Sequence, residues 1–309
     1  MGDHRSGASR VRIRQPVDPA QPASNRAPGA SMGVEVAECI GSSSRPARQL
    51  APRCNGAVLR TPHLWKECRA SLQASPCNKY WNPLLTISAL IVAAGRGQRM
   101  ARDTPKQYLP LRGRAVLAHT IDALLASPLI SHVRTVIHAD DQQLYETALQ
   151  GTTDDRILPP VPGGTTRSAS VALGLQSLSA QAPDHVLIHD AARPFCPVDL
   201  IERVIAPLDQ CDGAFAALPV VDAMWKAVDG YATTPVDRTG LWRAQTPQAF
   251  RYDAILSAHQ QLPTPVADDV EVARLAGLTV QIVGGDERNF KITLPADLDR
   301  AERLIDGDF

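Results

Sequence analysis

The stretch Thr86-Ile-Ser-Ala-Leu-Ile-Val-Ala-Ala-Gly-Arg-Gly-Gln-Arg-Met100 decides the fold. Its first part is an apolar run that ends in glycine, which is typical of a parallel strand buried on both faces. Its second part holds two glycines among basic residues, so we expect the strand to run into a tight turn. Further buried strands are expected at 132–139, 185–190, 213–221 and 278–283.

Helical patterns alternate with these strands. We expect helices at 115–126, 141–149, 167–178, 197–208, 252–262, 268–276 and 295–305, and a loop at 159–164. This alternation predicts an α/β fold, a single Rossmann-like domain over 85–309 with a mostly parallel sheet. Ligands of such sheets bind beyond the carboxyl ends of the strands, so the residues that follow each strand are the candidate site.

Composition excludes two classes of protein. The 309 residues contain 32 basic and 32 acidic side chains and are 44% hydrophobic, a normal fraction for a globular protein. No run of 18 apolar residues exists, so a membrane-spanning helix is not expected. The absence of net charge argues against a protein coated in nucleic acid, and no nucleic-acid partner is expected for the core.

Residues 1–84 differ from the rest of the chain. They hold 12 Lys and Arg against 5 Asp and Glu, nine of the 25 prolines and four of the six cysteines. No helical or strand period is sustained there, so we expect a disordered basic extension, or a segment that results from the choice of start codon. A transit peptide remains an alternative, whereas the four cysteines lack the paired Cys-x-x-Cys spacing of a zinc site.

The turn after the first strand carries glycines and cations. Gly95 and Gly97 allow backbone N–H groups to face an anion, and Arg99 and Lys106 follow closely. Met100 stands where a dinucleotide fingerprint needs its third glycine, and no Gly-Lys-Ser/Thr of a P-loop is present. The turn therefore predicts either a different phosphate site or a solvated surface turn.

Further motifs make the resemblance specific. They are Pro162-Gly163-Gly164, Arg167 with Ser170, His189-Asp-Ala-Ala-Arg-Pro194, Asp237-Arg-Thr-Gly-Leu-Trp242, Thr246-Pro-Gln248 and Asn289-Phe-Lys-Ile-Thr293. In this order they resemble the 2-C-methyl-D-erythritol 4-phosphate cytidylyltransferases, nucleotidyltransferases of the non-mevalonate isoprenoid pathway. The resemblance covers about 86–307 and does not extend to residues 1–84.

The resemblance implies a reaction and its catalytic residues. A phosphate oxygen of 2-C-methyl-D-erythritol 4-phosphate would attack the α-phosphorus of CTP and release pyrophosphate, forming 4-diphosphocytidyl-2-C-methyl-D-erythritol. Arg99 and Lys106 would stabilise the transition state, and Arg238 and Lys291 would hold the acceptor phosphate. A divalent cation, Mg²⁺, would bridge the triphosphate, with protein ligands left unassigned. Because the phosphate nucleophile is already largely dianionic, fixed cations rather than a general base are expected.

The resemblance also assigns the nucleotide contacts. These residues are Ala93, Ala94, Gly95, Gly97, Gly163, Gly164, Ser170, Asp190 and Ala191. For Asp190, a ribose or metal contact competes with a helix cap. Arg193 is either the partner of Asp190 or a substrate ligand. The glycine pair either reads cytosine or simply ends a strand.

The acceptor side departs from the family in several places. The resemblance implies that Asp222 and Thr246 contact the acceptor, and the alternative for Asp222 is a solvated carboxylate in a turn. Ala223 and Ala267 stand where the family commonly has threonine, and Thr165 replaces an acidic residue after the glycine pair. A nucleotidyltransferase of another base or acceptor, or an inactive nucleotide-binding domain, is therefore kept as an alternative.

The segment at 221–243 interrupts the rhythm of strands and helices. It is long and polar, and an isolated two-stranded arm is marginal in water. The resemblance implies a dimerisation arm that carries Arg238 into the site of a second subunit, so a homodimer is expected. Only Cys196 and Cys211 lie in the core, which agrees with a reducing cytoplasm.

Overall fold

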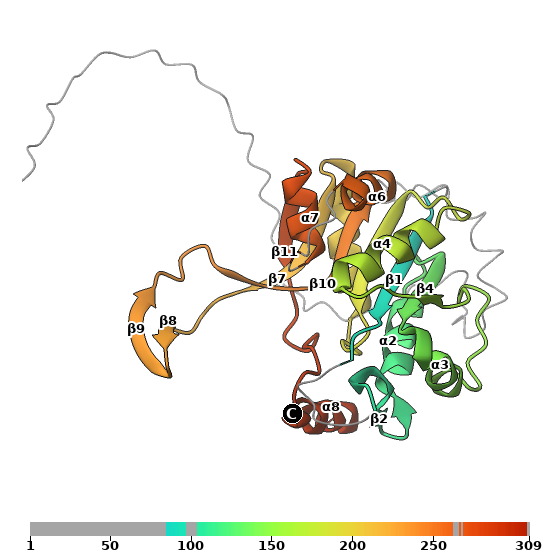
Figure 1. Ribbon diagram of the computed structural model, residues 1–309, viewed down its shortest axis with the longest axis horizontal. Coiled ribbons are helices and arrows are strands. Elements are labelled where there is room, and N and C mark those ends of the chain that lie inside the picture. Colours follow the sequence, from blue (N-terminus) through green and yellow to red (C-terminus); the bar gives the residue numbers. More distant parts are fainter. Residues whose placement is uncertain (1–84, 97–103, 262–265, 267, 308–309) are drawn as a thin grey trace, which may run out of the picture. The chain divides into compact units, whose positions relative to one another are not determined.

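The computed structural model describes residues 85–96, 104–261, 266 and 268–307 (Figure 1). Within them a seven-stranded sheet has the order β11-β7-β10-β6-β1-β4-β5. Its strands are β1 Ile87–Ala93, β4 His132–Ile137, β5 Val161–Pro162, β6 His185–Asp190, β7 Gly213–Pro219, β10 Trp242–Arg251 and β11 Val280–Gly284. All neighbours pair in parallel except β10, which is antiparallel to β6 and β7. The expected α/β fold with a mostly parallel sheet is confirmed.

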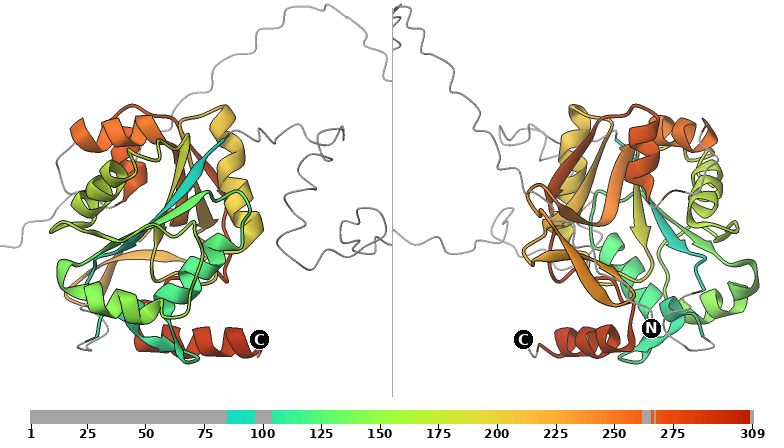
Figure 2. Two further views of the ribbon diagram at one scale, coloured as in Figure 1. Left: turned by 90° about the vertical axis from the view of Figure 1, so that its right-hand side faces the viewer. Right: turned by 60° about the vertical axis from the view of Figure 1, so that its left-hand side comes forward.

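Helices pack on both faces of this sheet (Figures 1 and 2). They are α2 Val116–Leu125, α3 Gln142–Ala148, α4 Arg167–Ser177, α5 Val198–Ile205, α6 Tyr252–Gln261 and α7 Asp269–Leu275. Strand β1 supplies both apolar layers by alternation, because Ile91 faces one buried cluster and Leu90 the other. Helices α2, α3 and α5 contribute to the first cluster and α4, α6 and α7 to the second.

A third, smaller apolar cluster lies beside the sheet. It joins the hairpin β2–β3 (Pro110–Leu111 and Arg114–Ala115) to the closing helix α8 (Pro295–Asp306) through Leu111, Ile292 and Ala301, all completely buried. Arg112 forms ion pairs with Glu302 and Asp306 at the rim of this cluster. The segment that carries Lys291 is therefore packed against the C-terminal helix through Ile292.

One prediction of local structure was wrong, and one strand was not predicted. The expected loop at 159–164 contains the short strand β5, which pairs with Val136 and Ile137. Strand β10 was not predicted, because its sequence includes Pro247, and proline is rarely found inside a central strand. The register with β7 shifts between Ala244 and Gln248, and this irregularity accommodates the proline.

An arm leaves the sheet between β7 and β10 (Figure 1). It consists of β8 (Met224–Val228) and β9 (Tyr231–Val236), an antiparallel pair joined by Asp229 and Gly230 with φ of 51° and 84°. Positive φ at both positions is typical of the tight hairpin turns that match strand twist. Trp225 and Tyr231 are 57% and 78% exposed. The predicted arm is therefore present as an unburied hairpin.

Several expectations fall outside the described residues: those on 1–84, on Gly97 and Arg99, and on Ala267. In the part of the chain that the structure describes, no helix is long and apolar enough to cross a membrane.

Candidate active site

The candidate site lies where β1 and β6 end. These strands are neighbours, and Val92 of β1 pairs with Asp190 of β6. Two adjoining cavities open there and share Val92, Gly95 and Arg167 in their walls. The first is also lined by Lys106, Asp190 and Lys291, and the second by Ala94, Gly164 and Ser170.

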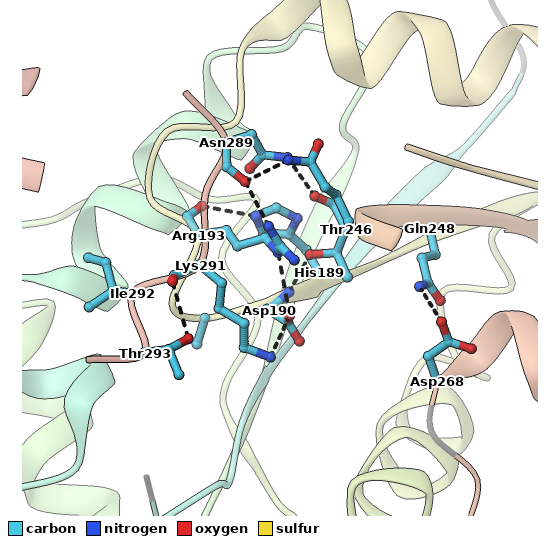
Figure 3. A network of polar contacts seen from close by, with 12 residues as sticks. His189, Asp190, Arg193, Thr246, Gln248, Asp268, Asn289, Lys291, Ile292 and Thr293 are labelled. Atoms are coloured by element: carbon cyan, nitrogen blue, oxygen red, sulfur yellow. Dashed lines mark hydrogen bonds and ion pairs between the residues drawn. The ribbon is translucent and has the colours of Figure 1, made fainter. Parts of the chain in front are cut away.

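Asp190 is the centre of charge in the first cavity (Figure 3). Its Oδ2 lies 2.8 Å from Nζ of Lys291 and 3.5 Å from Nε of Arg193, and its Oδ1 lies 3.9 Å from Nε of Arg167. Burial alone would raise the pKa of Asp190, but Lys291, Arg167 and Arg193 together hold that pKa well below its ordinary value. Asp190 is therefore a permanent carboxylate surrounded by cations.

A buried polar network fixes Asp190 from behind (Figure 3). Its backbone N–H donates to the hydroxyl of Thr246 at 3.0 Å, and Nδ2 of Asn289 donates to the Thr246 carbonyl at 2.8 Å. Nη1 of Arg193 donates to the Asn289 carbonyl at 2.7 Å, and the Arg193 side chain is 10% exposed. Arg193 thus serves as a partner of Asp190 and of the 289–293 segment.

The two lysines of the first cavity are held by the same piece of backbone. Lys106 begins a short 3-10 helix, η3 (Lys106–Tyr108), and its Nζ donates to the Ile292 carbonyl at 2.7 Å. Lys291 precedes that residue and reaches Asp190 with its ammonium group. The Ile292 N–H donates to the Ala192 carbonyl at 2.8 Å, which ties the segment to the end of β6. Both ammonium groups line one cavity as a result.

The glycine pair comes close to the end of β1. A Cβ on Gly163 would lie 2.6 Å from the Cβ of Ala94 and 2.7 Å from the Oγ of Ser170, so no larger residue fits there without movement. The Ser170 hydroxyl accepts from the Gly164 N–H at 3.1 Å and donates to the Thr166 carbonyl at 2.9 Å. Helix α4 thereby holds the glycine pair against Ala94 at the end of β1.

Arg167 connects the site to a buried ion-pair network that the sequence did not suggest. Its Nη1 lies 2.7 Å from Oδ2 of Asp269, and Oδ1 of Asp269 lies 3.1 Å from Nε2 of His259. The side chains of His259 and Asp269 are 2% and 1% exposed. A charged carboxylate at this depth requires such partners, so Arg167 is fixed between Asp190 and helix α7.

The structure brings together many, but not all, of the residues assigned from sequence. Around the two cavities lie Ala93, Ala94, Gly95, Lys106, Gly164, Ser170, Asp190, Ala191 and Lys291, with Gly163 packed behind them. Thr246 is buried behind Asp190. Asp222 and Arg238 lie in the exposed segment that leads into and out of the arm, outside both cavity walls. Arg99 and Gly97 are outside the described residues.

The residues present suit a divalent cation that takes most of its ligands from a substrate. Within the described part of the chain, no group of three His, Cys, Asp or Glu side chains could hold a metal ion, and Asp190 is the one acidic residue of the two cavity walls. Mg²⁺ is commonly bound by one or two carboxylates together with substrate phosphates and water. A single carboxylate fits that mode and does not fit an all-protein metal site.

Comparison with known proteins identifies a matching family. The profile of the 2-C-methyl-D-erythritol 4-phosphate cytidylyltransferase family matches residues 87–306. A protein of that name from Cereibacter sphaeroides is 51% identical over 221 residues, which is 72% of this chain and 97% of the relative. A bifunctional enzyme, IspD/IspF, from Rhodospirillum rubrum is also 51% identical, and the match spans 58% of its length.

Solved structures of similar proteins agree with this match. A 4-diphosphocytidyl-2C-methyl-D-erythritol synthase from Anaerococcus prevotii aligns with a TM-score of 0.62 at 29% identity, covering 72% of this chain and 99% of that one. A 2-C-methyl-D-erythritol 4-phosphate cytidylyltransferase from Thermus thermophilus aligns with a TM-score of 0.58 at 29% identity, covering 72% and 100%. The region that the family profile matches is the α/β core.

Proposed function

Because the chain belongs to the 2-C-methyl-D-erythritol 4-phosphate cytidylyltransferase family, we propose that its two adjoining cavities bind CTP and the acceptor phosphate. The enzyme is a nucleotidyltransferase that transfers CMP from CTP to 2-C-methyl-D-erythritol 4-phosphate in isoprenoid biosynthesis. The observation that carries the assignment of the site is the convergence of Lys106, Lys291 and Asp190 beside the glycine turn of β1.

The reaction requires an anion to approach a polyanion. A phosphate monoester oxygen of the acceptor attacks the α-phosphorus of CTP and forms a new P–O bond. The bond between the α-phosphorus and the oxygen that bridges to the β-phosphate breaks, and pyrophosphate leaves. The acceptor phosphate is mostly dianionic near neutral pH, so no proton has to be removed first. Preorganised cations lower this barrier because charge grows on the phosphate oxygens in the transition state.

The cations are proposed to act in two pairs with different roles. Lys106, together with Arg99, stabilises the α-phosphate in the transition state, and loss of one such preorganised donor costs about 3 kcal/mol in comparable sites. Lys291, together with Arg238, holds the acceptor phosphate in line for attack. Lys291 is suited to this because its side chain is 37% exposed and its ammonium group already lies in the first cavity.

The second cavity is proposed to hold the cytidine. Gly164 and Ser170 line this cavity, and Gly163 packs behind them. Carbonyl and hydroxyl oxygens of this segment would accept from the exocyclic amine of cytosine and would not accept from the oxygen that uracil has there. Thr165 also lines this cavity, where the family usually has a carboxylate. Base selection in this enzyme is therefore assigned to the backbone rather than to an acidic side chain.

Three further features are proposed with the activity. Mg²⁺ would be held by the triphosphate with Asp190 as its protein carboxylate, and it would neutralise phosphate charge. A homodimer would place Arg238, which lies outside both cavities of its own chain, in the site of the partner. A cytoplasmic location agrees with the free thiols of Cys196 and Cys211.

The proposed function is tested by measuring pyrophosphate release with each of the four nucleoside triphosphates, with and without 2-C-methyl-D-erythritol 4-phosphate. We expect release with CTP only when the acceptor and Mg²⁺ are present. Release with UTP or GTP instead of CTP would show that Thr165 has changed the base specificity. Release with CTP and a different sugar phosphate would show that the acceptor assignment is wrong.

A further inference from the structure

Arg96 makes an unusual set of contacts for a residue in a glycine turn. It lies directly after Gly95, in the wall of the second cavity, yet its guanidinium group turns toward the end of β4. Nη1 lies 2.8 Å from Oδ1 of Asp141, and Nη2 lies 3.1 Å from Oδ2 of Asp140 and also contacts Nδ1 of His138. Three groups of one short segment therefore hold a single side chain of the nucleotide turn.

The partner at Asp141 distinguishes this contact from an ordinary surface ion pair. The side chain of Asp141 is 2% exposed, whereas that of Asp140 is 78% exposed. Exposed pairs contribute little because water competes for both charges, but a carboxylate removed from water depends strongly on its cation. The Arg96–Asp141 contact is therefore the one that fixes the guanidinium group in place.

The opposite side of the turn is held by a second side chain. Nε2 of Gln107 donates to the Ala93 carbonyl at 2.6 Å and to the Gly95 carbonyl at 3.1 Å. Carbonyl oxygens directed at a triphosphate would repel it, and both of these are bound by an amide instead. Gln107 thus controls the direction of the backbone, and Arg96 fixes the position of the turn against the end of β4.

We propose that Arg96 is a positioning residue for CTP, which docks the start of the glycine turn, residues 93–96, on Asp141 in the geometry that receives the nucleotide. This inference rests on the proposed binding of CTP beside the turn. Arg96 acts through its contact with Asp141 and not by touching the phosphates. Without the anchor, residues 93–96 adopt the binding geometry for only a fraction of the time, and the apparent affinity for CTP is reduced to that fraction of its full value.

The test compares three variants with the wild-type enzyme: Arg96→Met, Asp141→Asn and the double variant. If the turn is competent for about a tenth of the time without its anchor, each single variant raises the KM for CTP about tenfold. We expect kcat at saturating CTP and the KM for the acceptor to stay within about twofold of wild type. The double variant should be no worse than either single variant, because both changes remove the same contact.

Two controls separate positioning from general stability. Arg114→Met makes the same substitution in an exposed ion pair of similar length, 2.7 Å between Nη1 of Arg114 and Oδ2 of Asp122, away from both cavities, and should leave the KM for CTP unchanged. Arg96→Lys keeps a cation beside Asp141 and should restore part of the CTP affinity. The dissociation constant of CTP, measured for each folded variant by calorimetric titration, should follow the same order as the KM values.

Other results would overturn the inference. If Arg96→Met weakens CTP binding while Asp141→Asn leaves it unchanged, Arg96 contacts the phosphates itself. If both variants lose affinity for CTP and acceptor alike, the contact only stabilises the fold. Failure of the proposed function would appear in the wild-type enzyme as absence of turnover with CTP, whereas failure of this inference would appear only in the variants.

Discussion

Asp190 shows how a single residue combines structural and functional demands. Its carboxylate is buried at the end of a central strand, where an isolated charge would be costly, and three cations offset that cost. Two of the cations, Arg167 and Arg193, are fixed by Asp269 and by the Asn289 carbonyl. Lys291 is the most exposed of the three, so it is the cation that can reach a substrate phosphate while Asp190 keeps its other partners.

His189, the neighbour of Asp190, predicts how stability depends on pH. Burial lowers its pKa to about 4, despite the favourable contact between its Nε2 and the Arg193 carbonyl. The imidazole of an unfolded chain has a pKa of about 6.5, so between about pH 6.5 and 4 the unfolded chain binds a proton that the folded chain does not. The free energy of unfolding should therefore fall across this range, by up to about 3 kcal/mol from this residue.

The measurement is urea unfolding of wild type and His189→Asn at pH 7 and at pH 4.5. Loss of the buried contact makes the variant less stable than wild type at pH 7. From pH 7 to pH 4.5, however, the free energy of unfolding of the variant should fall by about 2–3 kcal/mol less than that of wild type. His185 contributes in the same direction in both proteins, since burial also lowers its pKa. Equal pH dependence in the two proteins would mean that His189 is not kept neutral by burial.

At the scale of helices and strands, the sequence predicted those elements that show a clear spacing of apolar residues within their own sequence. Strand β6 and helix α4 occur within a residue of the expected bounds, because each is a clean apolar or amphipathic run. Strand β10 was missed because the sheet, and not its own sequence, makes it a strand. Its polar Gln248 is buried between the neighbours β6 and β7, and Gln245 is buried against Asp286 and Asn289.

The candidate site could be predicted in part for the same reason. The glycine turn, Lys106, Asp190 and Lys291 lie in motifs that are visible along the chain, and the structure gathers them in one cavity. Arg96, Gln107 and Asp269 gain their importance only from partners distant in sequence, such as Asp141 and His259. No local pattern indicates which arginine or aspartate of a chain will meet a buried partner.

Helix α8 allows a prediction about one element. It packs through Ala301, which is completely buried, and Cζ of the Arg300 guanidinium group lies over the ring of Phe290, 4.1 Å from the centroid. Ala301→Asp should undock α8 and displace Lys291, so kcat/KM should fall about 100-fold, since a 1 Å misplacement has that effect in comparable sites. The two larger apolar clusters do not include α8, so far-UV circular dichroism should show that most helical content remains.

A matched control lies on the same helix. Ile305 is 40% exposed, so Ile305→Asp adds the same charge without burying it and should keep near wild-type kcat/KM. If Ala301→Asp retains full activity, the position of Lys291 does not depend on α8. If both variants lose activity equally, the added charge and not the docking of the helix is responsible.

At the scale of the whole molecule, the arm leads to a prediction about complementation between two subunits. Arg238 donates to the Val221 carbonyl at the base of the arm and lies outside both cavities of its own chain. If it completes the site of a partner, Arg99→Ala and Arg238→Ala chains, each inactive alone, should complement each other after co-refolding. Random pairing makes half of the dimers mixed with one intact site each, so about a quarter of wild-type activity should return.

The comparison requires proof that mixed dimers form, for which two different affinity tags suffice. Recovery near a quarter would support a shared site. Mixed dimers without recovered activity would place Arg238 in its own subunit's site or outside the reaction. A mixture that is active before refolding would show that one of the single variants was not inactive, and the assignment of that residue would fail.

Strand β10 links the arm to the chemistry by continuous backbone. It leaves the arm at Trp242, passes Thr246 under Asp190, and ends in the sheet at Arg251. Subunit association and nucleotide occupancy would therefore act on the same strand from its two ends. By thermodynamic linkage, if bound CTP raises the affinity of one chain for the other by some factor, dimerisation raises the affinity for CTP by the same factor. If the enzyme is such a dimer, dilution would have the same effect, in free energy, as loss of part of its affinity for substrate.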